Sequence, residues 1–482
     1  MVTLSKESKV KLSAKNYTLI SSMLFGLFFG AGNLIFPLIM GAKAGGNLLP
    51  AIIGMIITAV GFPLLGVISM GISRSEGLMH MSSRVSKGYG YFFTCAVYLT
   101  IGPFFAIPRC AATSFSIGIN PILPSNLVVA IQAVFTFVFF AAVLFFSLRP
   151  SKIMETVGKW LNPVFLILLF VLIITVLVTP APAVSSEYPN PVADYVTGGG
   201  AFVAGFLQGY DTLDALASLA FGIIVINVIR GHGVSQPKDI AMGTVKSGAF
   251  SMSFMAVIYA LIALVGMKSY GLFAGQMATV NGFSGGDAFP IIAKYYLGVP
   301  GQILLALIVT FCCLKTAIGL VTSCSETFSA IFPKFLNYKI WAIIFTAFSF
   351  LVSNVGLSYI IKFSAPVLYF LYPLAIVLIL TSLFGKFFGH SQCVYIATTA
   401  FTMIAAIFDL IRVSGIAALN GVIEWVAGWL PLYKMGLGWI VPAAIGLAIG
   451  MLFKFVFKVG TKEAKIQLKE VLPAFEESEE KQ

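Results

Sequence analysis

Charged residues are scarce in this sequence. Only 10% of its 482 residues are Asp, Glu, Lys or Arg, whereas 59% are hydrophobic. Soluble domains carry about 25% charged residues, because polar side chains must cover a surface that faces water. This composition therefore excludes an ordinary soluble globule and indicates a protein surrounded by lipid.

Metal-binding and redox motifs are also lacking. The six cysteines lie in or beside apolar runs without Cys-x-x-Cys or Cys/His spacing, so neither a disulfide framework nor a zinc site is expected, and no cofactor is predicted. The 30 Lys and Arg residues are scattered over short loops and one tail, and no nucleic-acid-binding motif surrounds them. No nucleic-acid partner is therefore predicted. No feature indicates an oligomeric state.

What the sequence does contain is a series of apolar runs of the length that crosses a bilayer, about 20 helical residues. Strict alternation of apolar and polar residues is absent, so these runs predict an all-α polytopic membrane protein and not a barrel. Twelve transmembrane helices are predicted, at residues 18–40, 48–72, 90–118, 126–147, 160–179, 198–229, 241–267, 300–331, 340–355, 357–384, 392–411 and 436–457.

The distribution of Lys and Arg predicts the orientation. With a cytoplasmic N-terminus, twenty basic residues fall on the inner side of the membrane and five on the outer side. This bias is typical of a plasma-membrane protein with an even number of spans and both termini in the cytoplasm. Residues 1–17 then form a cytoplasmic N-terminus, 458–482 form a cytoplasmic tail, and no cleavable signal is expected.

The first span is an unusual membrane helix, because Gly26, Gly30, Gly32, Asn33 and Pro37 fall within twelve residues. Glycine and proline weaken a helix, so this pattern indicates a break that exposes backbone groups in mid-membrane. Such backbone is tolerated only where it lines a cavity. The alternative is close helix packing through small residues, since the spacing of Gly26 and Gly30 also fits a GxxxG contact.

The sixth span carries a similar anomaly. It reads Gly205-Phe-Leu-Gln-Gly209-Tyr-Asp-Thr-Leu-Asp214 and thus places two carboxylates in an apolar run. Charge in mid-membrane is costly, so Asp211 and Asp214 must be paired, protonated or hydrated. They share one helical face if the helix continues, and lie on either side of a break if it does not.

Two glycine-interrupted spans five helices apart predict an inverted repeat with a binding site at the repeat interface. The first five-helix repeat is predicted at 18–179 and the second at 198–384, each beginning with its broken helix, and 392–457 supplies helices 11 and 12.

The eighth span contains Lys315 about half way along a helix of roughly thirty residues, too far from either surface for its ammonium group to reach water easily. A buried lysine must find an anion or lose its proton. Thr316 either bonds its own backbone or offers an oxygen to a cation. Asp211 is the candidate counter-charge, which predicts a pair between Lys315 and Asp211.

Four motifs together resemble the branched-chain amino acid:cation symporters, or BrnQ-type carriers, over essentially the whole chain. They are Phe29-Gly-Ala-Gly-Asn-Leu-Ile-Phe-Pro37, Gly102-Pro-Phe-Phe-Ala-Ile-Pro-Arg109, Gly209-Tyr-x-Thr-x-Asp214 and Thr316-Ala-Ile-Gly-Leu320. The resemblance implies a leucine-transporter-like fold of ten core helices plus two. It also implies import of leucine, isoleucine and valine with Na⁺ or H⁺.

The resemblance further implies where the substrate binds. The amides of Ala31 and Gly32 would hold its carboxylate, and carbonyls near Gly209 and Tyr210 would hold its ammonium group. A helix N-terminus does offer free donors to an anion. The candidate substrate-binding residues are Gly30, Ala31, Gly32, Asn33, Gln208, Gly209 and Tyr210.

A sodium site between spans one and eight is implied in the same way, from the carbonyls of Gly26 and Phe29 and the hydroxyl of Thr316. Lys315 occupies the position of the second expected hydroxyl, so a lysine that replaces the ion or carries the proton is the competing interpretation. The candidate cation-coupling residues are Gly26, Phe29, Asp211, Thr212, Asp214, Lys315 and Thr316, and Na⁺ is the only metal for which a site is predicted.

Three other functions compete with a coupled carrier. The first is a uniporter or exchanger in which Lys315 replaces the ion. The second is an intramembrane serine hydrolase, because residues 282–286 read Gly-Phe-Ser-Gly-Gly, although the three histidines all fall in predicted cytoplasmic loops. The third is a channel, for which no filter motif is present. We therefore predict a transporter and not an enzyme, with Arg109 bracing a neighbouring helix or a gate.

Overall fold

The computed structural model describes residues 12–73, 75, 77–149, 159–180, 192–196, 198–234, 236–280 and 282–458. All secondary-structure elements in these ranges are helices, as predicted. The predicted tail, apart from residue 458, and residues 1–11 of the predicted N-terminus lie outside the described residues.

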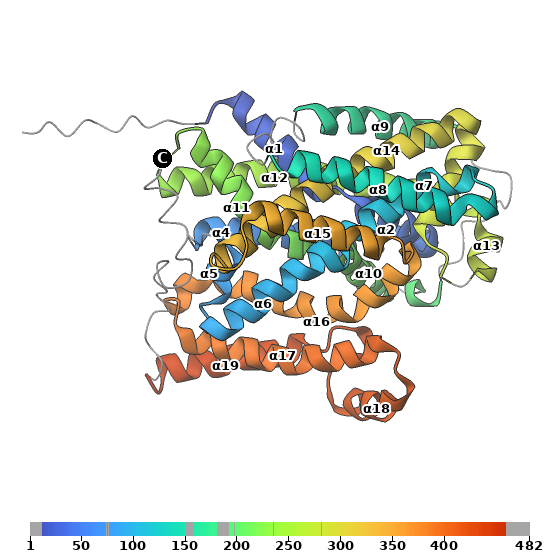
Figure 1. Cartoon of the computed structure of the whole chain (residues 1–482). Helices are drawn as coiled ribbons and strands as arrows, with labels where there is room; N and C mark the ends of the chain where they lie inside the picture. Colours follow the sequence, from blue (N-terminus) through green and yellow to red (C-terminus); the bar gives the residue numbers. More distant parts are fainter. Residues whose placement is uncertain are drawn as a thin grey trace, which may run out of the picture.

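The helices follow the predicted apolar runs closely, with α5, α13 and α18 as short additional helices (Figure 1). Their bounds are α1 Ala14–Phe28, α2 Ala31–Ala44, α3 Leu48–Ile56, α4 Phe62–Ile72, α5 Leu78–Ser82, α6 Lys87–Leu99, α7 Ala106–Gly118, α8 Val128–Ser147, α9 Asn162–Val178, α10 Gly198–Gln208, α11 Asp214–Gly231, α12 Pro237–Lys268, α13 Ala274–Thr279, α14 Gly285–Ile331, α15 Tyr338–Ser353, α16 Leu357–Leu383, α17 Gln392–Ser414, α18 Asn420–Trp429 and α19 Ile440–Phe455.

Several of these helices join end to end into longer, bent segments. α3 and α4 are connected by a π-helical segment, Ile57–Gly61, and α6 and α7 by another, Thr100–Phe104, where Gly102 and Pro103 interrupt the regular helix. α14 bends at Gly298, whose φ of 62° is a left-handed conformation that suits glycine. The bend separates the first part of α14 from the predicted eighth span.

Within the described residues, nine helical segments are long and apolar enough to cross a membrane, and α15 and α19 are two shorter apolar helices. Consecutive helices without a gap, such as those between Ala31 and Ile72, count as one of the nine. The number of twelve spans and the division into two repeats therefore stay predictions.

The long helices run roughly parallel in one bundle (Figure 1). α1 begins and α19 ends at the left of the bundle in this view, where α5 also lies, whereas α13 and α18 lie at the right. The two ends of the described chain are thus on the same side of the bundle.

Two helix pairs pack with almost no space between their backbones. A Cβ at Gly41 of α2 would lie 1.9 Å from the carbonyl oxygen of Ala263, and one at Gly266 of α12 would lie 2.0 Å from that of Leu38. Small residues are what permit such close approach between membrane helices.

α3 and α10 pack with the same reciprocal arrangement. A Cβ at Gly54 of α3 would lie 2.0 Å from the carbonyl oxygen of Phe202, and one at Gly205 of α10 would lie 2.0 Å from that of Ala51. In both pairs each helix contributes a glycine and, three residues before it, the residue that the partner glycine contacts. These contacts fix α2 and α10, the two helices that lead into the site.

Candidate functional site

The first predicted span is broken at Phe29 and Gly30. α1 ends at Phe28 and α2 begins at Ala31, and between them Phe29 (φ −73°, ψ 93°) and Gly30 (φ −116°, ψ −161°) are extended. The Gly30 amide donates to Asn33 Oδ1 at 2.8 Å, so it does not complete a helical bond to the Gly26 carbonyl. The prediction of a break is confirmed. The amides in the first turn of α2 have no acceptor within their own helix.

The sixth span is broken as well. α10 ends at Gln208, residues Gly209–Thr212 form a 3-10 turn, and α11 begins at Asp214. Leu213 between them has φ 68° and ψ 4°, a left-handed conformation that costs a non-glycine residue about 1–2 kcal/mol. At Leu213 the chain changes direction between the turn and α11. This change of direction separates Asp211, in the turn, from Asp214, at the start of α11.

A buried hydrogen-bond network joins the two breaks. Asn33 Nδ2, from the first turn of α2, donates to Asp214 Oδ2 at 2.7 Å. The Tyr259 hydroxyl of α12 donates to the same oxygen at 2.7 Å and also contacts Asn33 Nδ2. All three side chains are buried. The network holds the start of α2 against the start of α11 and gives the Asp214 carboxylate two polar partners.

Seven of the predicted residues meet at one small internal cavity of about 30 Å³. They are Gly30, Ala31, Gly32, Asn33, Thr212, Asp214 and Thr316. Arg109 and Cys110 of α7 and apolar residues such as Phe28 and Phe221 complete its wall. Pockets that hold small molecules usually measure about 300–1,000 Å³, so the walls must move before an amino acid can enter.

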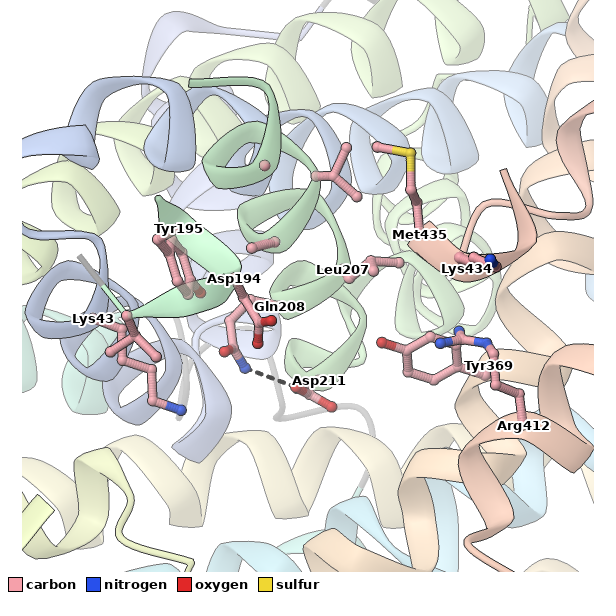
Figure 2. A pocket seen from close by; sticks show the side chains of 14 residues that line it. Lys43, Asp194, Tyr195, Leu207, Gln208, Asp211, Tyr369, Arg412, Lys434 and Met435 are labelled. Carbon is pink, nitrogen blue, oxygen red and sulfur yellow. Dashed lines mark hydrogen bonds between the residues drawn. The ribbon is translucent and has the colours of Figure 1, made fainter. Parts of the chain in front are cut away.

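A larger pocket of about 470 Å³ contains two further predicted residues, Gln208 and Asp211 (Figure 2). Gln208 Nε2 donates to Asp211 Oδ2 at 2.7 Å. The charged side chains of Lys43, Asp194, Arg412 and Lys434 line the same pocket. Asp211 and Asp214 therefore face different spaces.

Gly209 and Tyr210, two predicted substrate-binding residues, pack against neighbouring helices. A Cβ at Gly209 would lie 2.7 Å from Thr58 Cβ, and the ring of Tyr210 stacks on that of Tyr372 with 4.3 Å between centroids. Neither residue lines the small cavity. Their backbone forms the turn that precedes Leu213, and their role in substrate binding stays a prediction.

The predicted sodium-site residues lie behind the first break. The Phe29 carbonyl accepts hydrogen bonds from Thr316 Oγ1 at 3.3 Å and from Cys312 Sγ at 3.2 Å. This places the first break in contact with α14, as the resemblance implied. Gly26 lies two residues before the end of α1, and its carbonyl lacks the amide of Gly30 as a partner.

Lys315 is buried but does not contact Asp211. Its Nζ donates to Asn162 Oδ1 at 3.0 Å and lies 3.9 Å from the centre of the Phe165 ring. Cation–π attraction of this kind partly replaces the water that a buried ammonium group loses. The predicted pair between Lys315 and Asp211 is wrong, because α9 supplies the partners of Lys315.

The serine of the hydrolase-like motif has a structural role. The Ser284 side chain caps α14 by accepting from the Gly286 amide at 3.2 Å, and its hydroxyl donates to Asp287 Oδ2 at 2.8 Å. N-capping is the usual role of a serine at the start of a helix.

Sequence reasoning missed one residue of the site, Tyr259, and assigned a second, Arg109, a structural role alone. Tyr259 lies in an unremarkable apolar span, and no pattern distinguishes it from a tyrosine of the core. Arg109 was noted, but as a structural brace. Its Nη1 donates to the Asp211 carbonyl oxygen at 2.8 Å, which is a bracing contact, yet the same side chain lines the cavity.

Comparison with known proteins gives consistent results. A family described as "Branched-chain amino acid transport protein" matches residues 13–456. The "Branched-chain amino acid permease BrnQ" of Lactobacillus delbrueckii is 47% identical over 92% of this chain and 97% of its own length, and that of Bacillus subtilis is 38% identical over 94% and 99%. The "Branched-chain amino acid transport system 2 carrier protein" of Pseudomonas aeruginosa is 36% identical over 89% and 94%.

Among solved structures, the chain resembles Mhp1, a nucleobase-cation-symport-1 family transporter in a closed conformation with bromovinylhydantoin bound. The TM-score is 0.57 at 13% identity, covering 94% of this chain and 95% of that one. At this identity the likeness shows the fold alone.

Proposed function

The chain belongs to the branched-chain amino acid transport protein family, and from this premise we propose that it imports leucine, isoleucine and valine by symport with a cation, H⁺ or Na⁺. It is a multi-pass membrane protein whose named relatives are permeases and carriers, which are transporters and not enzymes. The plasma membrane, with both termini in the cytoplasm, is its proposed location.

The observation that carries this proposal is the meeting of two broken helices at one buried cavity. The start of α2 and the Asp214 carboxylate at the start of α11 line this cavity together, and Asn33 joins them. Free backbone groups at a helix N-terminus favour a carboxylate, and a buried carboxylate favours an ammonium group or a proton. A zwitterionic amino acid meets both requirements, because it carries a carboxylate and an ammonium group.

The packing around the two breaks supports an inverted repeat. If spans one and six are equivalent, α1 corresponds to α10 and α2 to α11, because α1 and α10 precede their breaks and α2 and α11 follow them. α1 packs on α12 and α10 on α3, whereas α2 packs on α12 and α11 on α4, so both halves of each broken span contact the second span of the other repeat. Equivalent interfaces are expected when two repeats are related by a pseudo-two-fold axis.

Alternating access is supported by the difference between the two spaces. The cavity at Asp214 measures about 30 Å³, whereas the pocket at Asp211 measures about 470 Å³. A carrier that closes around its substrate must first open the smaller space to one side of the membrane and then to the other.

Two places in the structure are candidates for binding the coupling ion. A proton would bind at Asp214, whereas Na⁺ would bind near the carbonyls of Gly26 and Phe29 and the hydroxyl of Thr316. An exchanger without a coupling ion is the second candidate function, since the Lys315 ammonium lies one residue from Thr316 and 5.7 Å from the Phe29 ring centre. Lys315 would then act as a permanently resident cation.

Uptake of radiolabelled isoleucine into proteoliposomes tests these alternatives. A proton gradient that alone drives accumulation supports coupling through Asp214, and a sodium gradient that alone does so supports the Phe29 and Thr316 site. Counterflow of isoleucine without accumulation under either gradient supports the exchanger. Absence of both uptake and counterflow for all three branched-chain amino acids contradicts the substrate assignment.

A further inference from the structure

Arg109 is a buried cation that no carboxylate contacts directly within the described residues. Only 4% of its surface is exposed, and its one hydrogen bond within the described residues runs from Nη1 to the carbonyl oxygen of Asp211 at 2.8 Å. No carboxylate of the described chain lies within 4.0 Å of its guanidinium group. Phe36 provides a further contact, with the guanidinium carbon 5.4 Å from its ring centre. Burying an arginine in this way is costly, because the guanidinium group stays charged.

The position of this guanidinium group is determined by the first break. Nη2 lies 2.9 Å from the point that a Cβ on residue 32 would occupy, so the absence of a side chain at Gly32 lets it reach the start of α2. Its other terminal nitrogen contacts the turn of the sixth span. Arg109 thus touches both broken helices and lines the cavity between them.

The kink of the third span explains why an arginine can reach this place. Gly102 has non-helical dihedral angles, and Phe105 has a φ of −131°. The regular helix is therefore interrupted, and α7 begins as a new helix at Ala106. Arg109 falls in the first turn and a half of this new helix, at the depth of the two breaks. An uninterrupted third span would have a different direction at this point.

We propose that Arg109 binds the carboxylate of the substrate, together with the amides at the start of α2; this inference rests on the proposed function and specifies its substrate contact. A guanidinium group offers two parallel N–H donors that match a carboxylate. Asp214 lines the same cavity and faces the substrate ammonium group. The site therefore selects free α-amino acids and rejects analogues whose carboxylate is neutralised.

The test compares leucine with leucinamide, in which a neutral amide replaces the carboxylate, as competitors of isoleucine uptake in proteoliposomes. The wild-type protein should prefer leucine strongly. In Arg109→Gln the ratio of the two half-inhibitory concentrations should fall at least about 30-fold, because the carboxylate loses its charged partner. A loss of general structure would weaken both competitors alike and leave the ratio unchanged.

Arg84→Gln is the matched control, because Arg84 is also a buried arginine but donates to the Ser73 carbonyl and contacts His390, away from the cavity. Its ratio should equal that of the wild type. An unchanged ratio in Arg109→Gln overturns the inference and leaves the α2 amides as the carboxylate site.

Should Arg109→Gln fail to elute as a monodisperse protein, Arg109→Lys replaces it. Lysine keeps the charge but lacks the paired N–H groups, so the ratio should fall by about 3-fold or more, and an unchanged ratio again overturns the inference. Failure of the proposed function has a different signature, since the wild-type protein itself would then show neither isoleucine uptake nor counterflow.

Discussion

Asp211 and Asp214 are three residues apart, yet they occupy different environments. Asp214 is buried, accepts hydrogen bonds from Asn33 and Tyr259, and lines the small cavity. Asp211 is only partly buried, is bonded to Gln208 and lines the larger pocket. In a continuous helix both would share one face. The left-handed conformation of Leu213 separates them, so the break creates one carboxylate inside the site and one outside it.

Removing the charge of Asp214 should have the largest effect. Asp214→Asn keeps the size of the side chain but removes an anion from a network built around it, and breaking a buried charge interaction costs about 3–5 kcal/mol. Gradient-driven uptake of isoleucine should fall by roughly 100-fold or more. Initial rates in proteoliposomes, normalised to the amount of reconstituted protein, measure this effect. Equal losses in Asp214→Asn and Asp211→Asn would contradict the distinction between the two carboxylates.

Tyr259→Phe should have the next largest effect, because it removes one of the two donors that hold the Asp214 carboxylate while the ring keeps its packing. A hydrogen bond to a charged group contributes about 1.5–3 kcal/mol, so uptake should fall by roughly 10-fold or more. The same assay measures it.

Tyr433→Phe is its control. Tyr433 is also buried and donates one hydrogen bond, to the Phe408 carbonyl at 2.8 Å, away from the cavity. Uptake close to that of the wild type is expected, and a loss equal to that of Tyr259→Phe would show that any buried tyrosine hydroxyl matters.

Gly32→Ala should have a smaller effect, through the contact of α2 with Arg109. The new Cβ would lie 2.9 Å from Arg109 Nη2 and 3.2 Å from the Phe36 ring, so the guanidinium group must shift. A displacement of this kind costs about 1 kcal/mol or more, which raises the KM for isoleucine roughly fivefold. In Gly46→Ala, where a Cβ meets nothing within 4 Å, the KM should be unchanged, and equal values for the two variants would contradict this account.

Much of this site was predictable because its anomalies are local in the sequence. Gly30 and Asn33 stand out in an apolar run, and so do Gly209 and Asp214, since each breaks the composition that a membrane helix needs. Both breaks were predicted from these residues alone. The all-α fold followed from composition in the same way.

Contacts between distant spans were not predictable, because nothing in one helix specifies which side chains of another face it. Lys315 was expected to pair with Asp211 and instead contacts Asn162 and Phe165, which read as ordinary residues at the start of an apolar run. Tyr259 was overlooked for the same reason. The role of Arg109 depends on the space left by Gly32, which only the packed structure reveals.

Asp211→Asn should have the smallest effect of these substitutions. The amide can still bond Gln208, and the Arg109 contact uses the backbone carbonyl of residue 211, which the substitution keeps. The lost charge faces a pocket shared with Lys43, Arg412 and Lys434, where water and salt screen the interaction. The KM for isoleucine should therefore change by less than about threefold, and by less at high than at low ionic strength. A larger change that salt does not reduce would mean that Asp211 acts within the buried site, and the comparison with Asp214 would fail.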